Sequence, residues 1–248
     1  MAKSGVTVLS LTGLLAVWFV GAWLTADPMV LPYPGEVLSV IIDHARSGKL
    51  WVHMGATLRR VLLAFVLAMV SGGFLGLVLG QSERLNRWLD PWVTVLLNVP
   101  ALVVIVLCYL WIGLNETAAI IAVALNKFAM VTVTIREGVR ALDRGVADMA
   151  QVYRMPLAAR LRHVIWPQLG PFVAASTRNG LAVIWKIVLV VEFLGRSNGV
   201  GFQIHLYFQL FDTASVLAYA LSFTALMLVI EYAIVQRWEQ RSSAWRRA

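Results

Sequence analysis

Residues 148–171 read DMAQVYRMPLAARLRHVIWPQLGP and interrupt a chain that is otherwise strongly apolar. Three prolines, three arginines and a histidine fall in this stretch, whereas 60% of the whole chain is hydrophobic and only 14% is charged. The mean hydropathy of +0.77 is too high for an ordinary soluble domain. The composition therefore indicates a membrane protein, in which this polar stretch separates apolar runs. Those runs determine the fold class.

Six runs carry no charge or almost none, and each has about the 17 to 25 residues that a helix needs to cross the hydrocarbon core. They are residues 6–24, 61–80, 92–114, 117–135, 171–191 and 213–230. We therefore predict an all-α membrane protein with about six transmembrane helices in a single domain, residues 1–248. The first run is longer than a usual signal-peptide core, so we expect it to be a retained helix.

The distribution of basic residues predicts the orientation of these spans. An even number of spans puts both termini on one side, and lysine and arginine accumulate on the cytoplasmic side. The side of the termini collects Lys3, Arg84, Arg87, Arg136, Arg140, Arg144, Arg154, Arg160, Arg162, Arg237, Arg241, Arg246 and Arg247. The outer loops hold Arg46, Lys49 and Arg196. We therefore place both termini on the cytoplasmic side of the membrane.

The net charge of +8 follows from this topology. The chain has no basic run interleaved with aromatic residues, the pattern that would indicate nucleic-acid binding. Arg59 and Arg60 lie near the outer end of the second span and run against the rule. We expect them to snorkel toward the surface or to pair with acidic residues.

Two outer segments have recognisable patterns. In residues 31–45, LPYPGEVLSVIIDHA, Pro34 suits the first turn of an amphipathic helix, which we expect to lie along the outer membrane surface. Residues 195–212 begin with GRSNGVGFQI, a glycine-rich break between the last two spans. Non-helical backbone is tolerated there only where protein or water covers it, and a plain surface turn is the alternative.

No motif of an enzyme site is present. The chain has no HExxH helix, no GxSxG elbow and no GxxxxGK[ST] loop for a nucleotide. Its single cysteine, Cys108, lies in an apolar run and indicates neither a disulfide nor a metal site. We expect no catalytic residue, cofactor or metal in this chain, so if the protein moves a solute uphill, another chain must bind the ATP.

Polar residues within the spans are candidates for a translocation pathway, because an ion in the bilayer needs a polar cavity or a partner. They are Asn126, Lys127, Asn179, Lys186 and Glu192. Asn179 and Lys186 are seven residues apart and share a helix face, whereas Lys186 and Glu192 do not. Either the lysines face the pathway and favour an anionic cargo, or they pair between helices and snorkel.

Two further patterns concern helix packing. Gly72, Gly76 and Gly80 line one face of the second span, where they let a neighbouring backbone approach closely, for ordinary packing or as part of a moving interface. Pro100 removes a backbone hydrogen bond within the third span and predicts a kink there.

The loop of residues 136–170 is far longer than a turn between two spans requires. Val146, Met149, Ala150 and Tyr153 recur at helical spacing, and Pro156 suits the first turn of a second helix, which we expect to end at Pro167. Arg154 and Met155 then form the corner. Apolar side chains near this tip predict a docking surface for a soluble partner, with a helix pair lying flat on anionic lipid as the alternative.

The motifs of this loop and of its neighbours resemble those of inner-membrane permease subunits of binding-protein-dependent ABC importers, in the nitrate, sulfonate and taurine branch. In that family the loop carries E-A-A, a glycine four residues later and then I-L-P. Asp148-Met149-Ala150, Arg154 and Ile165-Trp166-Pro167 occupy those places here. LPYPGEVL, TLRRVLLAF, GLVLG, VVEFLG and NGVGFQI are similar to further segments of the branch, so the likeness covers nearly the whole chain.

The resemblance implies a homodimer of permease subunits, two cytoplasmic ATPase subunits and a periplasmic solute-binding protein that delivers the cargo. It implies that the loop is a coupling helix seated in a groove of the ATPase. The residues that the resemblance assigns to this coupling are Asp148, Met149, Ala150, Gln151, Val152, Tyr153, Arg154, Met155 and Pro156. The buried lysines favour an anion such as a sulfonate, nitrate or carboxylate. An ATP-independent channel or secondary transporter is the alternative function.

Two positions depart from the family pattern. Methionine replaces the middle alanine at Met149, and arginine replaces the glycine at Arg154. Because arginine adopts a left-handed turn less readily than glycine, two interpretations remain open. Either Pro156 enforces the corner in another conformation, or the ATPase groove differs and offers an acidic partner.

Overall fold

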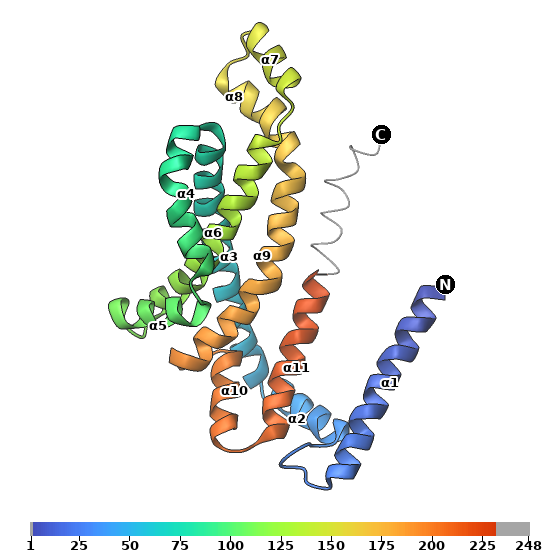
Figure 1. Cartoon of the computed structure of the whole chain (residues 1–248). Coiled ribbons are helices and arrows are strands. Elements are labelled where there is room, and N and C mark those ends of the chain that lie inside the picture. Colours follow the sequence, from blue (N-terminus) through green and yellow to red (C-terminus); the bar gives the residue numbers. More distant parts are fainter. Residues whose placement is uncertain (1, 232–248) are drawn as a thin grey trace. The chain divides into compact units, whose positions relative to one another are not determined.

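The computed structural model describes residues 2–231, and this part of the chain is helical, without a β-strand (Figure 1). The helices are α1 (Ala2–Thr25), α2 (Pro34–Arg46), α3 (Lys49–Gln81), α4 (Glu83–Asn98), α5 (Ala101–Ile112), α6 (Glu116–Arg140), α7 (Arg144–Val152), α8 (Leu157–Arg160), α9 (Trp166–Gly195), α10 (Val200–Gln209) and α11 (Thr213–Ile230). They divide into two compact units. The first comprises residues 2–57 and 192–227, and the second Leu58–Val191 with residues 228–231. Arg237, Arg241, Arg246 and Arg247 lie outside the described residues.

In the second unit, α3 and α6 pack closely because α3 presents glycines to α6. A Cβ atom added at Gly72 would lie 2.7 Å from the carbonyl oxygen of Phe128, and one at Gly76 would lie 2.6 Å from that of Thr132. A third, at Gly80, would meet Val139 at 2.5 Å. The expectation that these glycines let a neighbouring backbone approach is therefore confirmed.

The same two helices are joined at one end by ion pairs. The guanidinium of Arg60 is only 2% exposed and binds the Glu116 carboxylate through two hydrogen bonds of 2.9 and 2.8 Å. Arg59 reaches the same carboxylate at 3.1 Å. Of the two expectations for these arginines, pairing is confirmed, and the pair fixes the register of α3 against α6.

The third predicted span, residues 92–114, is broken rather than merely kinked. The axes of α4 and α5 differ by 98° at a break beside Pro100. Val99 is extended, with φ −70° and ψ 125°, because the ring of the following proline disfavours helical backbone at the preceding residue. The break makes this segment either a broken span or a re-entrant loop.

The six predicted spans all fall on helices, but they do not all meet one criterion of length and apolar composition. Among the described helices, α3, α6 and α11 meet it, and the bent α4–α5 pair makes a fourth. In α1 only Leu9–Thr25 counts as apolar, and α9 carries Arg178 and Lys186 within its predicted span. The count of six therefore stays a prediction for α1 and α9.

The long loop forms α7 and α8, which lie beyond the ends of α6 and α9 (Figure 1). The expectation that Pro167 ends the second of these helices is wrong. After α8 the chain makes a π-helical segment, Leu161–Ile165, and continues directly into α9. The wider π turn relieves the clash between the proline ring and the preceding turn, so the helical path passes Pro167.

In the first unit, α2 begins at Pro34 as expected, and the backbone N–H of Tyr33 donates to the Glu36 carboxylate at 3.0 Å. The break predicted for residues 195–204 is much shorter than expected. Only residues 196–199 are non-helical, and α10 begins at Val200. The reason lies in the contacts of Glu192, described below.

Candidate functional site

The tip of the long loop exposes a group of apolar side chains at the end of α7. Val152 is 78% exposed, Tyr153 77% and Met149 46%. Asp148, Arg154 and Pro156 are also exposed, and Met155 is half-buried. The side chain of Gln151 is not described. Exposed apolar groups of this size on a projecting loop are typical of a surface that meets another molecule. We call Met149, Val152 and Tyr153 the apolar tip.

One predicted coupling residue, Ala150, does not belong to that surface. Its side chain is only 1% exposed and packs inside the chain. Its carbonyl oxygen instead accepts a hydrogen bond of 2.9 Å from the backbone N–H of Met155. The backbone carbonyl of Ala150 therefore positions the corner after α7.

Arg154 forms that corner in the left-handed conformation, with φ +48°. The bond from Met155 to Ala150 spans six residues and closes the turn that commonly ends a helix with a left-handed residue. Of the two interpretations left open by the sequence, the structure excludes the one in which Pro156 imposes another corner. Arginine adopts the conformation that glycine would adopt, at a cost of about 1 kcal/mol.

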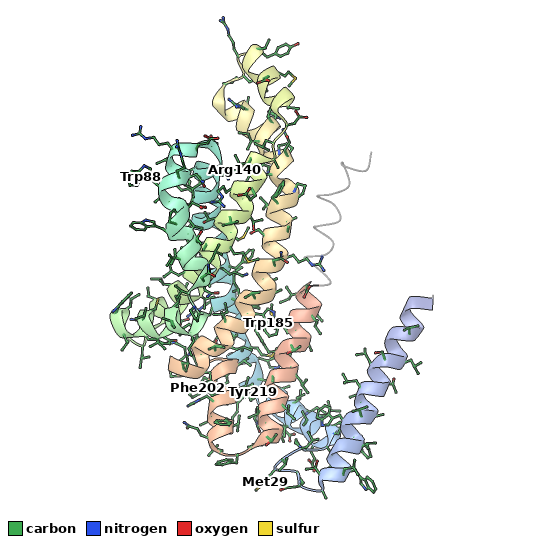
Figure 2. The ribbon with its side chains drawn as sticks, in the orientation of Figure 1. Met29, Trp88, Arg140, Trp185, Phe202 and Tyr219 are labelled. Carbon is green, nitrogen blue, oxygen red and sulfur yellow. The ribbon has the colours of Figure 1, made fainter. Side chains whose placement is uncertain are left out.

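The predicted pathway residues of the second unit fall into two groups. Asn179 and Lys186 are exposed on α9, where Val183 and Val190 continue the same exposed stripe. The Lys186 ammonium lies 5.5 Å from the ring of its neighbour Trp185, which Figure 2 labels. The stripe is apolar except for these two polar side chains.

Lys127 is placed differently. Its side chain is 4% exposed on α6, and its Nζ contacts the Met130 sulfur at 2.9 Å. Asn126 beside it is half-buried. The structure therefore does not put Lys127 on one exposed surface with Lys186.

Glu192 in the first unit is completely buried and is held by hydrogen-bond donors. Its Oε2 accepts hydrogen bonds of 2.8 Å from the Thr57 hydroxyl and from the backbone N–H of Gly201. The Thr57 hydroxyl in turn accepts from the N–H of Val200 at 2.8 Å. A carboxylate and a hydroxyl thus satisfy the first amides of α10, where the helix dipole favours a negative charge.

Gly199 lets the carboxylate reach these amides. Its φ is +109°, and a Cβ atom there would lie 2.3 Å from the carboxyl carbon of Glu192. Its own N–H donates to Nδ1 of His53 at 3.1 Å. Only glycine fits both the conformation and the space. These contacts explain why the glycine-rich break is short and covered, and they exclude a plain surface turn.

His53 completes what we call the Glu192 cluster, which consists of His53, Thr57, Glu192, Gly199, Val200, Gly201 and Gln203. Because Nδ1 of His53 accepts a hydrogen bond, the ring proton of the neutral imidazole lies on Nε2. That atom lies 2.8 Å from the side-chain amide nitrogen of Gln203, and a half-turn of the amide group would present its oxygen as the acceptor for the ring N–H. The cluster joins the start of α3 to α10 through directed hydrogen bonds.

Aromatic residues surround this cluster. Tyr219 stacks on Tyr207 with ring centres 5.9 Å apart, and its ring lies 5.5 Å from His44 and 6.2 Å from His53. Burial, aided by Asp212, raises the pKa of Tyr207.

Within residues 2–231, no three histidine, cysteine, aspartate or glutamate side chains come together as metal ligands.

Sequence reasoning identified Glu192 but missed its partners. A carboxylate in an apolar run needs donors, and the glycine-rich segment seven to nine residues later has free amides to offer. Thr57 and His53 could not be found in this way, because they lie on a helix more than a hundred residues away in the sequence.

Comparisons with known proteins agree with one another. A family model described as "Binding-protein-dependent transport system inner membrane component" matches residues 68–241. The putative aliphatic sulfonates transport permease protein SsuC of Bacillus subtilis is 29% identical over 94% of this chain and 84% of its own. The taurine transport system permease protein TauC of Escherichia coli is 31% identical over 84% of this chain and 78% of its own.

Solved structures show the same fold. A crystal structure of an amino acid ABC transporter aligns with a TM-score of 0.65 at 22% identity, over 81% of this chain and 98% of that one. An inward-facing form of the MetNI methionine ABC transporter aligns with a TM-score of 0.64 at 15% identity, over 73% of this chain and 92% of that one. At these identities the likeness concerns the fold.

Proposed function

This chain belongs to the family of inner membrane components of binding-protein-dependent transport systems, and from that premise we propose how it works and what it carries. Two copies form the translocation pathway of an importer for a small organic anion. Two ATPase subunits bind ATP and Mg²⁺ and power it from the cytoplasm, and a periplasmic binding protein delivers the solute. Both termini lie on the cytoplasmic side of the inner membrane.

The exposed stripe on α9 supports a second copy and a pathway. Lys186 and Asn179 lie within a predicted span, and a lysine at the centre of a bilayer costs about 2.5 to 3.5 kcal/mol or more when it faces lipid. Snorkelling relieves part of this cost, but an aqueous pathway lined by a second subunit removes it. The proposal leaves out Lys127, which is buried, and Glu192, whose carboxylate is engaged with α10.

The chemistry of the stripe supports an anionic solute. An ammonium group attracts an anion, and the asparagine amide can donate hydrogen bonds to sulfonate or carboxylate oxygens. The relatives named for aliphatic sulfonates and taurine make sulfonates the first candidates. The final selection among anions belongs to the binding protein, because the stripe offers only two polar groups.

The apolar tip supports coupling to a soluble partner. Met149, Val152 and Tyr153 are exposed together at the end of α7, and they are the single observation that carries this part of the proposal. An ATPase groove would bury these side chains. Burial in that groove would also remove water from the guanidinium of Arg154, a charge that the glycine of the family pattern lacks. The groove would therefore need an acidic group to pair with Arg154.

Uptake by the complete complex tests the proposal. Proteoliposomes that contain this chain with its ATPase should import taurine or a short alkanesulfonate only when ATP and the binding protein are both present. Removal of the binding protein serves as the control. Solute flux through the chain alone, without ATP, would instead support an ATP-independent channel or secondary transporter.

A further inference from the structure

A polar pocket lies in the second unit where the turn between α3 and α4 meets the end of α6. Its volume is about 610 Å³, and it is lined by Gly80, Gln81, Glu83, Asn86, Arg87 and Arg140. None of these residues belongs to the exposed stripe on α9 or to the apolar tip of α7. The pocket is therefore separate from both of the surfaces on which the proposed function rests.

The charges at the pocket leave one guanidinium free for a ligand. Arg87 is exposed, and no ion pair or hydrogen bond joins it to any residue that the structure describes. Arg140 lies 3.6 Å from Glu137, a carboxylate that also binds the guanidinium of Arg136 at 3.0 Å. Glu137 is therefore shared between two arginines, and it neutralises Arg140 only in part.

Of the acidic side chains nearby, Asp90 and Glu137 are engaged with arginines. Asp90 accepts a hydrogen bond from Arg136, and Asn86 presents its side-chain oxygen to the same guanidinium at 3.0 Å. Glu83 lies in the first turn of α4, where the helix dipole favours its charge. The free guanidinium of Arg87 and the partly neutralised one of Arg140 therefore suit an anionic ligand, and two guanidinium groups suit a phosphate.

The pocket lies at the boundary of the bilayer. It is bounded by the ends of α3 and α6, both of which are long and apolar enough to cross a membrane. Trp88 follows Arg87 directly in α4 and is 75% exposed, and Trp92, about one turn later, is 72% exposed; Figure 2 shows Trp88 pointing away from that helix. Tryptophan concentrates at the level of lipid headgroups, so the pocket and these rings share that level.

We propose that this pocket binds the phosphate-bearing headgroup of an anionic lipid, whose acyl chains lie along Leu85, Trp88 and Trp92. Arg87 and Arg140 hold the phosphate. The leaflet is the one on the side of α7 and α8, and only its identification as cytoplasmic rests on the proposed orientation. Basic pockets between membrane helices on that side are typical sites for anionic headgroups.

Lipid binding to the purified complex tests the proposal. In neutral detergent, native mass spectrometry should detect phosphatidylglycerol bound in preference to phosphatidylcholine, and phosphatidylglycerol should raise the midpoint of thermal unfolding. Arg87→Gln and Arg140→Gln should each weaken phosphatidylglycerol binding about fivefold, the contribution of one basic side chain at an anionic surface. Arg46→Gln, on the exposed end of α2, is the matched control and should not change it.

Three results would overturn the proposal. The first is wild-type affinity for phosphatidylglycerol in the Arg87→Gln variant, which changes an exposed side chain and should fold normally. The second is equal stabilisation by inorganic phosphate, which would identify the ligand as a soluble anion. The third is loss of the ATPase subunits from the Arg87→Gln complex at unchanged lipid affinity. Because the readout is lipid affinity, failure here leaves ATP-driven uptake untouched, and failure of uptake leaves the lipid site untouched.

Discussion

The Glu192 cluster buries polar groups and satisfies them with hydrogen bonds, whereas the tip of α7 leaves apolar side chains exposed. In the cluster a fully buried carboxylate receives hydrogen bonds from a hydroxyl and a backbone amide, and a glycine makes room for it. At the tip, Val152 and Tyr153 are more than three-quarters exposed, and Arg154 is held in a left-handed conformation. The cluster is complete within one chain, whereas the tip lacks the surface that would cover it.

This contrast separates residues that hold the fold from residues that serve a partner. Changes in the cluster should reduce the stability of the fold and, as a result, should also reduce transport. Changes at the tip should spare stability and affect only coupling. Substitutions in the cluster, at the tip and on the α9 stripe should differ accordingly, with the largest effect in the cluster.

The largest effect should come from Gly199→Ala. The new methyl group would overlap the Glu192 carboxyl group and force strain at φ +109°, so we expect a loss of several kcal/mol and little folded protein in the membrane. Glu192→Ala should behave similarly, because each buried donor left unpaired costs about 1 to 3 kcal/mol. Folded protein is measured by monodisperse yield and by thermal unfolding.

Gly55→Ala is the matched control for this prediction, since a Cβ atom there meets nothing within 4 Å. It should keep the yield and should not lower the unfolding midpoint, because alanine suits a helix interior better than glycine. Normal stability of Gly199→Ala would show that the cluster is looser than the structure indicates.

Tyr153→Asp should abolish most of the uptake and leave the fold intact. A carboxylate at the apolar tip would have to lose its water in a protein groove, and such a burial is costly without a partner. The unfolding midpoint of the chain should match that of the wild type, because the side chain is 77% exposed. Co-purification of the ATPase and ATP-dependent uptake are measured side by side, with Tyr153→Phe as the control that should retain both.

Lys186→Met should reduce the uptake of an anionic solute several-fold without changing assembly. The substitution keeps most of the side-chain length and removes the charge that an anion would meet on the α9 stripe. Lys186→Arg keeps the charge and should retain uptake. Equal uptake by all three proteins would mean that Lys186 serves packing or snorkelling, and the pathway would have to be sought on another face.

The smallest effect should come from Arg154→Gly. Glycine adopts the left-handed corner without the penalty that arginine bears, so the variant should gain about 1 kcal/mol of stability. If Arg154 meets an acidic group on the ATPase, uptake should fall although stability rises. Val152→Gly, in the last turn of α7, should lose stability and provides the comparison in thermal unfolding.

Local patterns of the sequence predicted much of the fold. Neighbours along one helix are enough to predict Pro34 at the start of α2 and the close approach at the three glycines of α3. The cost of a buried charge predicts that Arg59 and Arg60 pair with an acidic residue. Arg154 was identified as the unusual position, and its left-handed φ explains why glycine would suit that place.

Features that depend on tertiary contacts could not be predicted in this way. Nothing near Glu192 indicates Thr57 and His53, because only folding brings α3 to the start of α10. Pro167 was expected to end a helix, yet a π turn carries the chain past it. The same limit applies to Ala150 and Lys127, whose burial depends on the helices packed around them.

Site-specific crosslinking at the apolar tip tests the account most directly. The chain has a single cysteine, so Cys108→Ala allows a benzophenone to be attached at Tyr153→Cys in a complex that still transports. Illumination should join this chain to the ATPase subunit, and a probe at Ser47→Cys, on the exposed turn after α2, should not. Crosslinks to lipid alone, in a complex that retains ATP-dependent uptake, would contradict the account and show that α7 lies on the membrane.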